Sequence, residues 1–465
     1  MTQGNCVAIS RANPSVHAEA QTGFVWPGRM AAGLWAALAV ALGLLAVFCL
    51  PPFLERHVVT TGRVGGALVA GLLYGLSAGW ALAGVASARL AVRRWRNPRV
   101  PSARRPAFAA VTLLLSLGAA VGVAEVAVRI LIRPALVLVG DDWWRHRYAT
   151  EHPDSSSVPV SIRNLASTRH DPLRGWALRP GYRSDKVNIN AQGIRGLREH
   201  LYTKPPGERR IVIVGDSFTF GEEVADAEVY TERLDELMNG VRVIGLGVPA
   251  YGTDQQYLTL REQGFAFDPD LVIVGVFEEN ADRNTLSFRD YIKPQFKRQD
   301  GAWHLTNVPV PAPADCPWLS TPPRPGCYVW ALAQKAILRL RDRTWWSPRW
   351  PVTEAILDKI ARATRDQDAR LLVLYIPTTF DLQREDAEIF LQRWSARTNT
   401  PLLNLRDVFA ALPKADRKRV YRYHWTPFGH EVVARALRDR IEQDGLLDAR
   451  HAALPASKDF GEAPP

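Results

Sequence analysis

The chain has 465 residues and a formal net charge of +11, and it is long enough for a membrane anchor and a domain of about 300 residues with a full core. The charge alone would suggest a nucleic-acid-binding protein, but residues 89–105 hold seven arginines and no acid. Because this block lies between apolar segments, it indicates membrane topology, and a nucleic-acid partner is excluded. The four cysteines form no Cys-x-x-Cys pair and no Cys/His cluster, so no metal site is predicted.

Residues 29–132 are predicted to be a membrane anchor that follows a cytoplasmic amino-terminal segment, 1–28. Three runs in this region carry no charged residue: Met30 to Leu54, Val64 to Ala88, and Pro106 to Ala124. Each run approaches or exceeds the roughly 20 residues that a helix needs to cross a bilayer. We therefore expect three transmembrane helices.

The loops between these runs predict the orientation. Loop 89–105 is strongly basic and is expected in the cytoplasm, whereas loop 55–63 is short and mixed in charge and can lie outside. The chain after the third helix is then extracytoplasmic, which in a bacterium makes this a multi-pass inner-membrane protein with a periplasmic domain. Glu125 and Arg129, near the end of the third helix, are spaced to neutralise each other along one helix face.

Residues 133–170 are polar and irregular in pattern, and they are predicted to be a juxtamembrane linker. Within residues 171–196, the block Val187 to Gly196 has the pattern of a short strand and a tight glycine turn that lead into the domain. An edge hairpin or a lid is expected here, and no chemistry.

Residues 171–447 are predicted to form an α/β domain. Apolar runs typical of buried strands alternate with helical patterns, the first helix being expected over 226–239. This alternation predicts a parallel sheet with helices on both sides. The expected strands are 211–214, 241–245, 271–277, 371–376 and 401–405, and a helix is expected to follow Thr426-Pro427.

Ser217 occupies a special place in this pattern. It follows the strand Ile211 to Val214 and the turn Gly215-Asp216, so it lies at the carboxyl end of a strand, where open α/β sheets place their ligand sites. It also lies at the start of a helix, whose N–H groups favour developing negative charge. A plain helix cap is the alternative interpretation.

Four blocks in order give this region a resemblance to a known family. They are Gly-Asp-Ser at 215–217, Gly-Val-Pro-x-Tyr-Gly at 247–252, Asn280 after the third strand, and His424-Trp425 before Pro427. Over about 171–440 the chain resembles the SGNH (GDSL) hydrolases, and most closely their membrane-anchored bacterial members, in which segments like 175–181 and 189–196 precede the Gly-Asp-Ser. The resemblance implies a three-layer, flavodoxin-like parallel sheet.

The resemblance also implies roles for individual residues. Ser217 matches the nucleophile and His424 the general base. The oxyanion donors would be the Ser217 N–H, the Asn280 amide and one loop N–H, for which Ala250 and Gly252 both remain candidates. The alternatives are that His424 is a packed histidine and that Asn280 merely caps a turn.

The chain departs from the family at the catalytic acid. The family carries an acid two or three residues before the histidine, where this chain has Arg422 and Tyr421. A Ser-His dyad could work with a backbone carbonyl or with a more distant acid such as Asp407 or Asp416, or the active site could be degraded.

The resemblance implies an ester hydrolase or O-acyltransferase that uses no cofactor. Together with the predicted location, it implies a glycan or lipid ester of the cell envelope as the substrate. The alternative is a catalytically degraded SGNH-fold subunit for binding or assembly in envelope polysaccharide biosynthesis. The sequence leaves the acyl group, the acceptor and the oligomeric state open.

Residues 297–330 are predicted to be an insertion rich in Pro and Trp. In an oxidising compartment, Cys316 and Cys327 could close a loop by a disulfide. The tryptophans could line a sugar-binding groove or simply pack: Trp303, Trp318 and Trp330. The tail, 448–465, is predicted to be disordered.

Overall fold

The computed structural model describes residues 121–122, 124–151, 167–342, 347–378 and 386–448. The chain divides into two compact units, 1–132 and 133–465. Among the described residues, no helix combines the length and the apolar character that crossing a membrane requires. The three predicted spans lie outside these ranges apart from the last residues of the third, so the anchor stays a prediction. In the first unit, Arg129 and Glu125 form the expected ion pair at 2.5 Å.

The second unit is built on one sheet of five parallel strands. Its spatial order is β4-β3-β5-β8-β9. If these five strands are renumbered 1 to 5 in the order in which they occur along the chain, their spatial order becomes 2-1-3-4-5. This is the flavodoxin-like order. The prediction of an α/β fold with a parallel sheet is confirmed. The strands are β3 (Arg209–Gly215), β4 (Val241–Gly247), β5 (Leu271–Phe277), β8 (Arg370–Ile376) and β9 (Leu402–Asn404).

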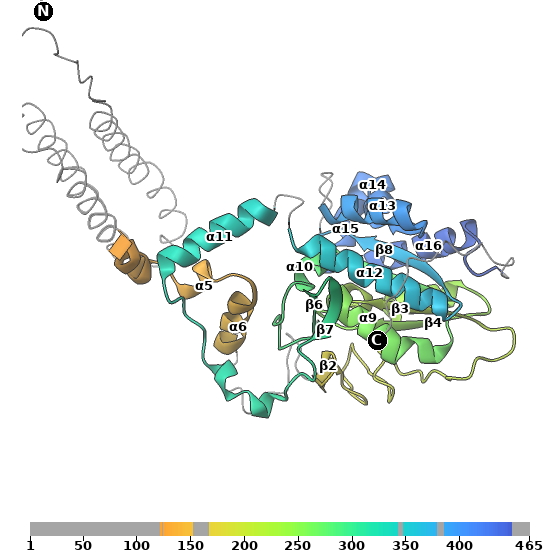
Figure 1. The fold of residues 1–465 in the computed structure, drawn as a ribbon. Helices are drawn as coiled ribbons and strands as arrows, with labels where there is room; N and C mark the ends of the chain where they lie inside the picture. Colours follow the sequence, from red (N-terminus) through yellow and green to blue (C-terminus); the bar gives the residue numbers. More distant parts are fainter. Residues whose placement is uncertain (1–120, 123, 152–166, 343–346, 379–385, 449–465) are drawn as a thin grey trace, which may run out of the picture. The chain divides into compact units, whose positions relative to one another are not determined.

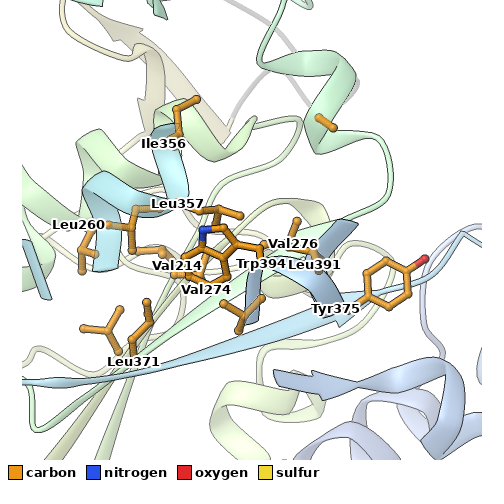
Figure 2. Close-up of a cluster of buried hydrophobic side chains, with 14 of the residues drawn as sticks. Val214, Leu260, Val274, Val276, Ile356, Leu357, Leu371, Tyr375, Leu391 and Trp394 are labelled. Atoms are coloured by element: carbon orange, nitrogen blue, oxygen red, sulfur yellow. The ribbon is translucent and has the colours of Figure 1, made fainter. Parts of the chain in front are cut away.

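Helices cover one face of the sheet through a cluster that includes Val212 and Val214 of β3. The covering helices are α9 (Thr253–Glu262), α12 (Arg349–Asp366) and α13 (Asp386–Thr398). In Figure 1, α9 and α12 lie side by side in front of the strands. Figure 2 shows how Leu260, Leu357 and Trp394 of these helices gather over Val274 of β5.

The opposite face of the sheet carries the alternate side chains of β3, Ile211 and Ile213. Alternation along a strand sends successive side chains to opposite faces, so a strand that is apolar throughout must be covered on both sides. The covering helices are α8 (Tyr230–Leu237), α14 (Leu405–Ala411) and α16 (Pro427–Gln443). The domain therefore has three layers.

Two small antiparallel hairpins lie outside the main sheet. The β1–β2 hairpin begins the region in which the sequence predicted a hairpin or a lid, and the Asp171 carboxylate accepts from the N–H groups of Leu173 and Arg174 in its turn. The strand pattern near Ile189 forms only isolated bridges. The hairpin strands are β1 (Thr168–Asp171), β2 (Gly175–Leu178), β6 (Gln295–Gln299) and β7 (Ala302–Thr306).

The segment after residue 133 is not the irregular linker that the sequence predicted. It forms α5 (Pro134–Val137) and α6 (Gly140–Glu151), and Tyr148 of α6 packs edge-on against Phe288. A long helix, α11 (Tyr328–Asp342), contacts α5 through Lys335, whose ammonium donates to Leu136 O at 2.7 Å. The remaining helices are α7 (Ser217–Phe220), α10 (Asn280–Arg283) and α15 (Lys414–Val420), with 3-10 turns at 226–228, 264–267, 313–315 and 317–320.

The predicted disulfide is not formed in this structure. Cys316 keeps a free thiol and is buried in a cluster with Tyr148 and Tyr291, where burial raises the pKa of the thiol. Cys327 is exposed at the start of α11, where its sulfur accepts from Trp330 N–H. The sequence spacing allowed the two cysteines to meet, but one of them is packed into the domain.

Candidate functional site

Ser217 is the first residue of the four-residue helix α7, directly after β3. The preceding residue fixes the turn, because the Asp216 carboxylate accepts from Phe218 N–H at 3.1 Å and caps the helix. Gly221, with φ of 81°, ends the helix in the left-handed conformation that glycine tolerates best. Ser217 is therefore held at the carboxyl edge of the sheet and is only 6% exposed.

Helix α7 lies unusually close to the strand ends, and glycines make this possible. A Cβ on Gly215 would come within 1.9 Å of Thr219 Oγ1, and a Cβ on Gly247 within 2.2 Å of Phe220 N. A Cβ on Gly275 would lie 3.0 Å from Thr219 Oγ1. One glycine each on β3, β4 and β5 thus makes room for the helix that carries Ser217.

His424 belongs to the carboxyl-terminal part of the domain, 207 positions after Ser217 in the chain. It lies in the short segment between Tyr421 and Trp425, which bridge each other, just before Thr426 caps α16. Trp425 is fully buried and fixes this segment. The His424 Nε2 atom lies 2.9 Å from Ser217 Oγ. The structure therefore brings together the two side chains that the sequence paired.

The carboxylates near the His424 ring come from a loop that sequence reasoning overlooked. Glu222 Oε2 lies 3.1 Å from Nε2, and Glu223 Oε1 lies 3.9 Å from Nδ1. The described ion pairs of His424 include neither of the two more distant acids that the sequence suggested; Asp416 pairs with Arg419 at 2.7 Å instead. The sequence signal that could have revealed these carboxylates was the pair of adjacent glutamates shortly after helix α7, which begins at Ser217.

The residues at the usual positions of the acid have other contacts. The Tyr421 hydroxyl donates to Pro377 O at 2.7 Å, and Arg422 N–H donates to His424 O at 2.8 Å. The Nδ1 atom of His424 is buried, and among the described residues it has no hydrogen-bond partner. The backbone-carbonyl alternative for this nitrogen therefore has no support in the described part of the chain.

The structure separates the two candidate loop donors of the oxyanion hole. Gly252 N–H donates to Gln255 Oε1 at 3.2 Å. Ala250 has a φ of 67°, a conformation typical of glycine. Within the described ranges its N–H has no acceptor, and Ser217 N–H, at the first position of its helix, has none either. These two N–H groups are the ones available to a developing oxyanion.

Asn280 is fully buried and its amide is already engaged. Its Nδ2 donates to Tyr251 O at 3.0 Å and to Asp216 Oδ2 at 3.3 Å. An amide nitrogen has two hydrogens, so an oxyanion could receive one only if the longer bond opened. The role of Asn280 as an oxyanion donor stays a prediction.

Arg283, which sequence reasoning did not select, joins the loops that follow three strands. Its guanidinium donates to Asp216 Oδ2 at 2.8 Å, to Tyr251 O at 3.0 Å and to Glu279 Oε2 at 3.1 Å. These acceptors follow β3, β4 and β5 respectively. A planar, multidentate donor suits this arrangement better than a lysine would. Arg283 thus holds together the three loops at the carboxyl edge of the sheet, next to Ser217.

No cluster of three or more His, Cys, Asp or Glu side chains suited to hold a metal ion occurs among the residues that the structure covers. The site consists of a serine hydroxyl next to an imidazole, two unengaged backbone N–H groups, and two nearby carboxylates. This set of groups can support nucleophilic attack and proton transfer.

Comparisons with known proteins give structural neighbours only. No protein-family model matches the chain, and no curated protein matches it. Similar solved structures include a GDSL-like lipase from Bacteroides thetaiotaomicron (13% identity, 52% of this chain and 91% of that chain, TM-score 0.30). A catalytic mutant of an acetylxylan esterase from Geobacillus stearothermophilus is also similar (14%, 51% and 96%, TM-score 0.31).

A third similar structure is the lipase/acylhydrolase from Enterococcus faecalis (16% identity, 51% of this chain and 96% of that chain, TM-score 0.31). The neighbours are thus GDSL lipolytic enzymes and esterases. Because these TM-scores lie below 0.5, the description of the fold rests on the strand order and the helix layers given above.

Proposed function

We propose that this protein is a serine ester hydrolase or O-acyltransferase of the SGNH type. The observation that carries the proposal is the 2.9 Å separation of Ser217 Oγ and His424 Nε2, two atoms that lie 207 positions apart in the chain. A hydroxyl this close to an imidazole nitrogen, at the carboxyl edge of a parallel sheet, has the geometry of a nucleophile with its general base.

The chemistry proceeds through an acyl-enzyme. The Ser217 Oγ bonds to the carbonyl carbon of an ester while its proton moves to His424 Nε2. The carbonyl oxygen becomes an oxyanion that the N–H groups of Ser217 and Ala250 can bind. The ester C–O bond then breaks, and His424 returns the proton to the leaving alcohol. Attack by water releases the acid, and attack by a sugar hydroxyl transfers the acyl group.

The proposed substrate is a glycan or lipid ester of the bacterial cell envelope, with three membrane helices holding the domain on the periplasmic side. The resemblance of segments 175–181 and 189–196 to those of membrane-anchored SGNH hydrolases supports this substrate class. The charge-free runs before residue 125 and the basic loop 89–105 support the location.

A second candidate is a binding or assembly subunit that keeps the fold without catalysis. Two observations favour it: Tyr421 and Arg422 stand where the family has its acid, and His424 Nδ1 is buried without a hydrogen-bond partner among the described residues. An imidazole without an acidic partner is held less firmly in the tautomer that catalysis requires.

Ester hydrolysis by the full chain in detergent distinguishes the two candidates. The wild-type protein should release p-nitrophenol from p-nitrophenyl acetate, and Ser217→Ala and His424→Ala should each lower kcat/KM by about 10²-fold or more, because each removes a group needed for attack. Ser184→Ala, a change of the same kind at an exposed serine, should have no effect. If the wild type were no faster than Ser217→Ala on this ester and on acetylated glycans, the binding function would replace the proposed one.

A further inference from the structure

The His424 ring has its two nitrogens in different situations. Nε2 lies beside Ser217 Oγ at 2.9 Å, whereas Nδ1 is buried and has no hydrogen-bond partner among the described residues. A buried ring nitrogen that carries a proton costs free energy when nothing accepts it. The carboxylate on the Nδ1 side is that of Glu223, whose Oε1 lies 3.9 Å away.

A buried arginine, Arg195, holds the loop that carries Glu223. The Arg195 guanidinium donates to the backbone carbonyls of Phe220, Gly221 and Val224, and it pairs with Asp226 at 2.8 Å. Its side chain is only 7% exposed. Arg195 belongs to segment 189–196, where the sequence predicted an edge hairpin or a lid and no chemistry. Its contacts place both ends of the 220–226 loop, and Glu223 lies between them.

Glu223 also has an unusual backbone. Its φ is 76°, in the left-handed region that few residues other than glycine, asparagine and aspartate occupy. A backbone conformation of this kind is unfavourable and persists only where the surrounding contacts hold it in place. Such conformations are most frequent at functional sites. Its side chain is 39% exposed, so it has room to rotate toward the ring.

We infer that Glu223, presented by the Arg195-braced loop, is the carboxylate that orients His424, in place of an acid in the segment before the histidine. Glu223 is a positioning residue: it acts through His424 and does not touch the substrate. Nδ1 would carry the proton and donate it to the Glu223 carboxylate. Nε2 is then left unprotonated to receive the Ser217 proton. This inference rests on the proposed function and deepens it.

Two other titratable groups surround the ring. Glu222, on the same loop, faces Nε2 at 3.1 Å. His430 of α16 interacts electrostatically with His424, and burial lowers the pKa of His430 to about 3, so it remains neutral at neutral pH. Glu222 is therefore the competing candidate for the carboxylate, and the experiment has to separate two adjacent glutamates.

The test uses a fluorophosphonate probe, which reacts with an activated serine and requires no knowledge of the substrate. The full chain in detergent is labelled across pH 5 to 9, and the rate of Ser217 modification is measured for the wild type, Glu223→Gln, Glu223→Gly and Glu222→Gln. Glu223→Gly removes the carboxylate and relaxes the positive φ, so lost labelling in this variant cannot be attributed to backbone strain. Glu236→Gln, a surface change of the same kind, is the matched control.

The expected result is a rate at pH 8 at least tenfold lower in both Glu223 variants than in the wild type. Glu223→Asp should recover part of the rate. Glu222→Gln should lose less than Glu223→Gln.

Three outcomes separate the hypotheses. If the wild type is not labelled at Ser217, the proposed function fails. If the wild type is labelled and both Glu223 variants behave like it, the inference fails and the proposed function stands. If Glu222→Gln loses as much as Glu223→Gln or more, the assignment of the carboxylate to Glu223 is overturned.

Discussion

At the scale of single residues, the glycine at the end of β4 carries a specific prediction. A Cβ at position 247 would approach Phe220 N at 2.2 Å and the Thr219 carbonyl carbon at 2.4 Å, and both atoms belong to the backbone of α7. Gly247→Ala should therefore displace the helix that carries Ser217. We expect a destabilisation of about 1–3 kcal/mol and a loss of esterase activity of about 10²-fold, because misplacing a reacting group by 1 Å has that effect.

The measurements are the urea midpoint, followed by tryptophan fluorescence, and kcat/KM on p-nitrophenyl acetate. Gly326→Ala is the control, because a Cβ at that position would meet nothing within 4 Å. A Gly247→Ala protein with wild-type midpoint and activity would show that the contact between α7 and β4 is not needed to hold the serine.

Sequence reasoning at this scale succeeded where a motif fixed the backbone and failed where contacts came from elsewhere in the chain. Ser217 and His424 could be paired because the resemblance to the SGNH hydrolases implies a role for each, and each lies beside a recognisable turn or helix start. The two candidate loop donors differ because Gly252 N–H donates to Gln255, whereas Ala250 N–H has no acceptor among the described residues, and a sequence shows neither contact. Glu223 was overlooked because its proximity to His424 depends on how Arg195 holds a loop.

At the scale of elements, α16 packs on α8 through a buried histidine, and this contact predicts how stability depends on pH. His430 is fully buried, its Nδ1 accepts from Tyr230 N–H at 3.2 Å, and its ring stacks on Tyr230. Burial lowers the pKa of His430 to about 3 and that of His200 to about 4. The unfolded chain protonates these rings near pH 6.5, before the folded protein can.

The direction of the effect follows from these pKa values. Above about pH 6.5 both states hold neutral rings, so the stability is fully present. As the pH falls toward 4 and then 3, only the unfolded state gains the protons, and the free energy of unfolding falls by at most about 1.4 kcal/mol per pH unit for each histidine. His430→Gln can still accept from Tyr230 N–H and cannot titrate, so its stability should fall less steeply between pH 6.5 and 4.5.

Urea unfolding at pH 7, 6, 5 and 4.5 measures this slope. His304→Gln, at an exposed position, should keep the wild-type slope. Equal slopes for His430→Gln and the wild type would mean that His430 becomes protonated in the folded protein and that α16 accommodates the charge.

The element scale also shows what periodicity could and could not predict. The five strands were recognised because continuous β-branched and apolar runs are rare outside buried parallel sheets. Their ends differ by one or two residues; β4, for example, extends to Gly247. Helices α6 and α11 were not predicted. They bury few apolar side chains of their own, and α6 is stabilised by contacts with distant segments, such as Tyr148 on Phe288.

At the scale of the whole molecule, the proposed substrate depends on which side of the membrane the second unit, 133–465, occupies. The sequence predicts three spans, an outer loop at 55–63 and a cytoplasmic loop at 89–105, and its excess of arginine lies in the latter. An envelope ester is accessible only if the second unit is extracytoplasmic. The topology is therefore a condition of the proposed substrate, whereas the proposed chemistry at Ser217 does not depend on it.

Fusions to alkaline phosphatase test the topology, because that enzyme is active only where its disulfides can form. In a bacterial host, fusions after Thr60 and after Asp448 should be active, and a fusion after Asn97 should be inactive. The Asn97 fusion is the internal control, since the basic loop is retained in the cytoplasm. Activity after Asn97 without activity after Asp448 would mean an inverted chain. The second unit would then face the cytoplasm, and the serine esterase chemistry would need an intracellular ester as its substrate.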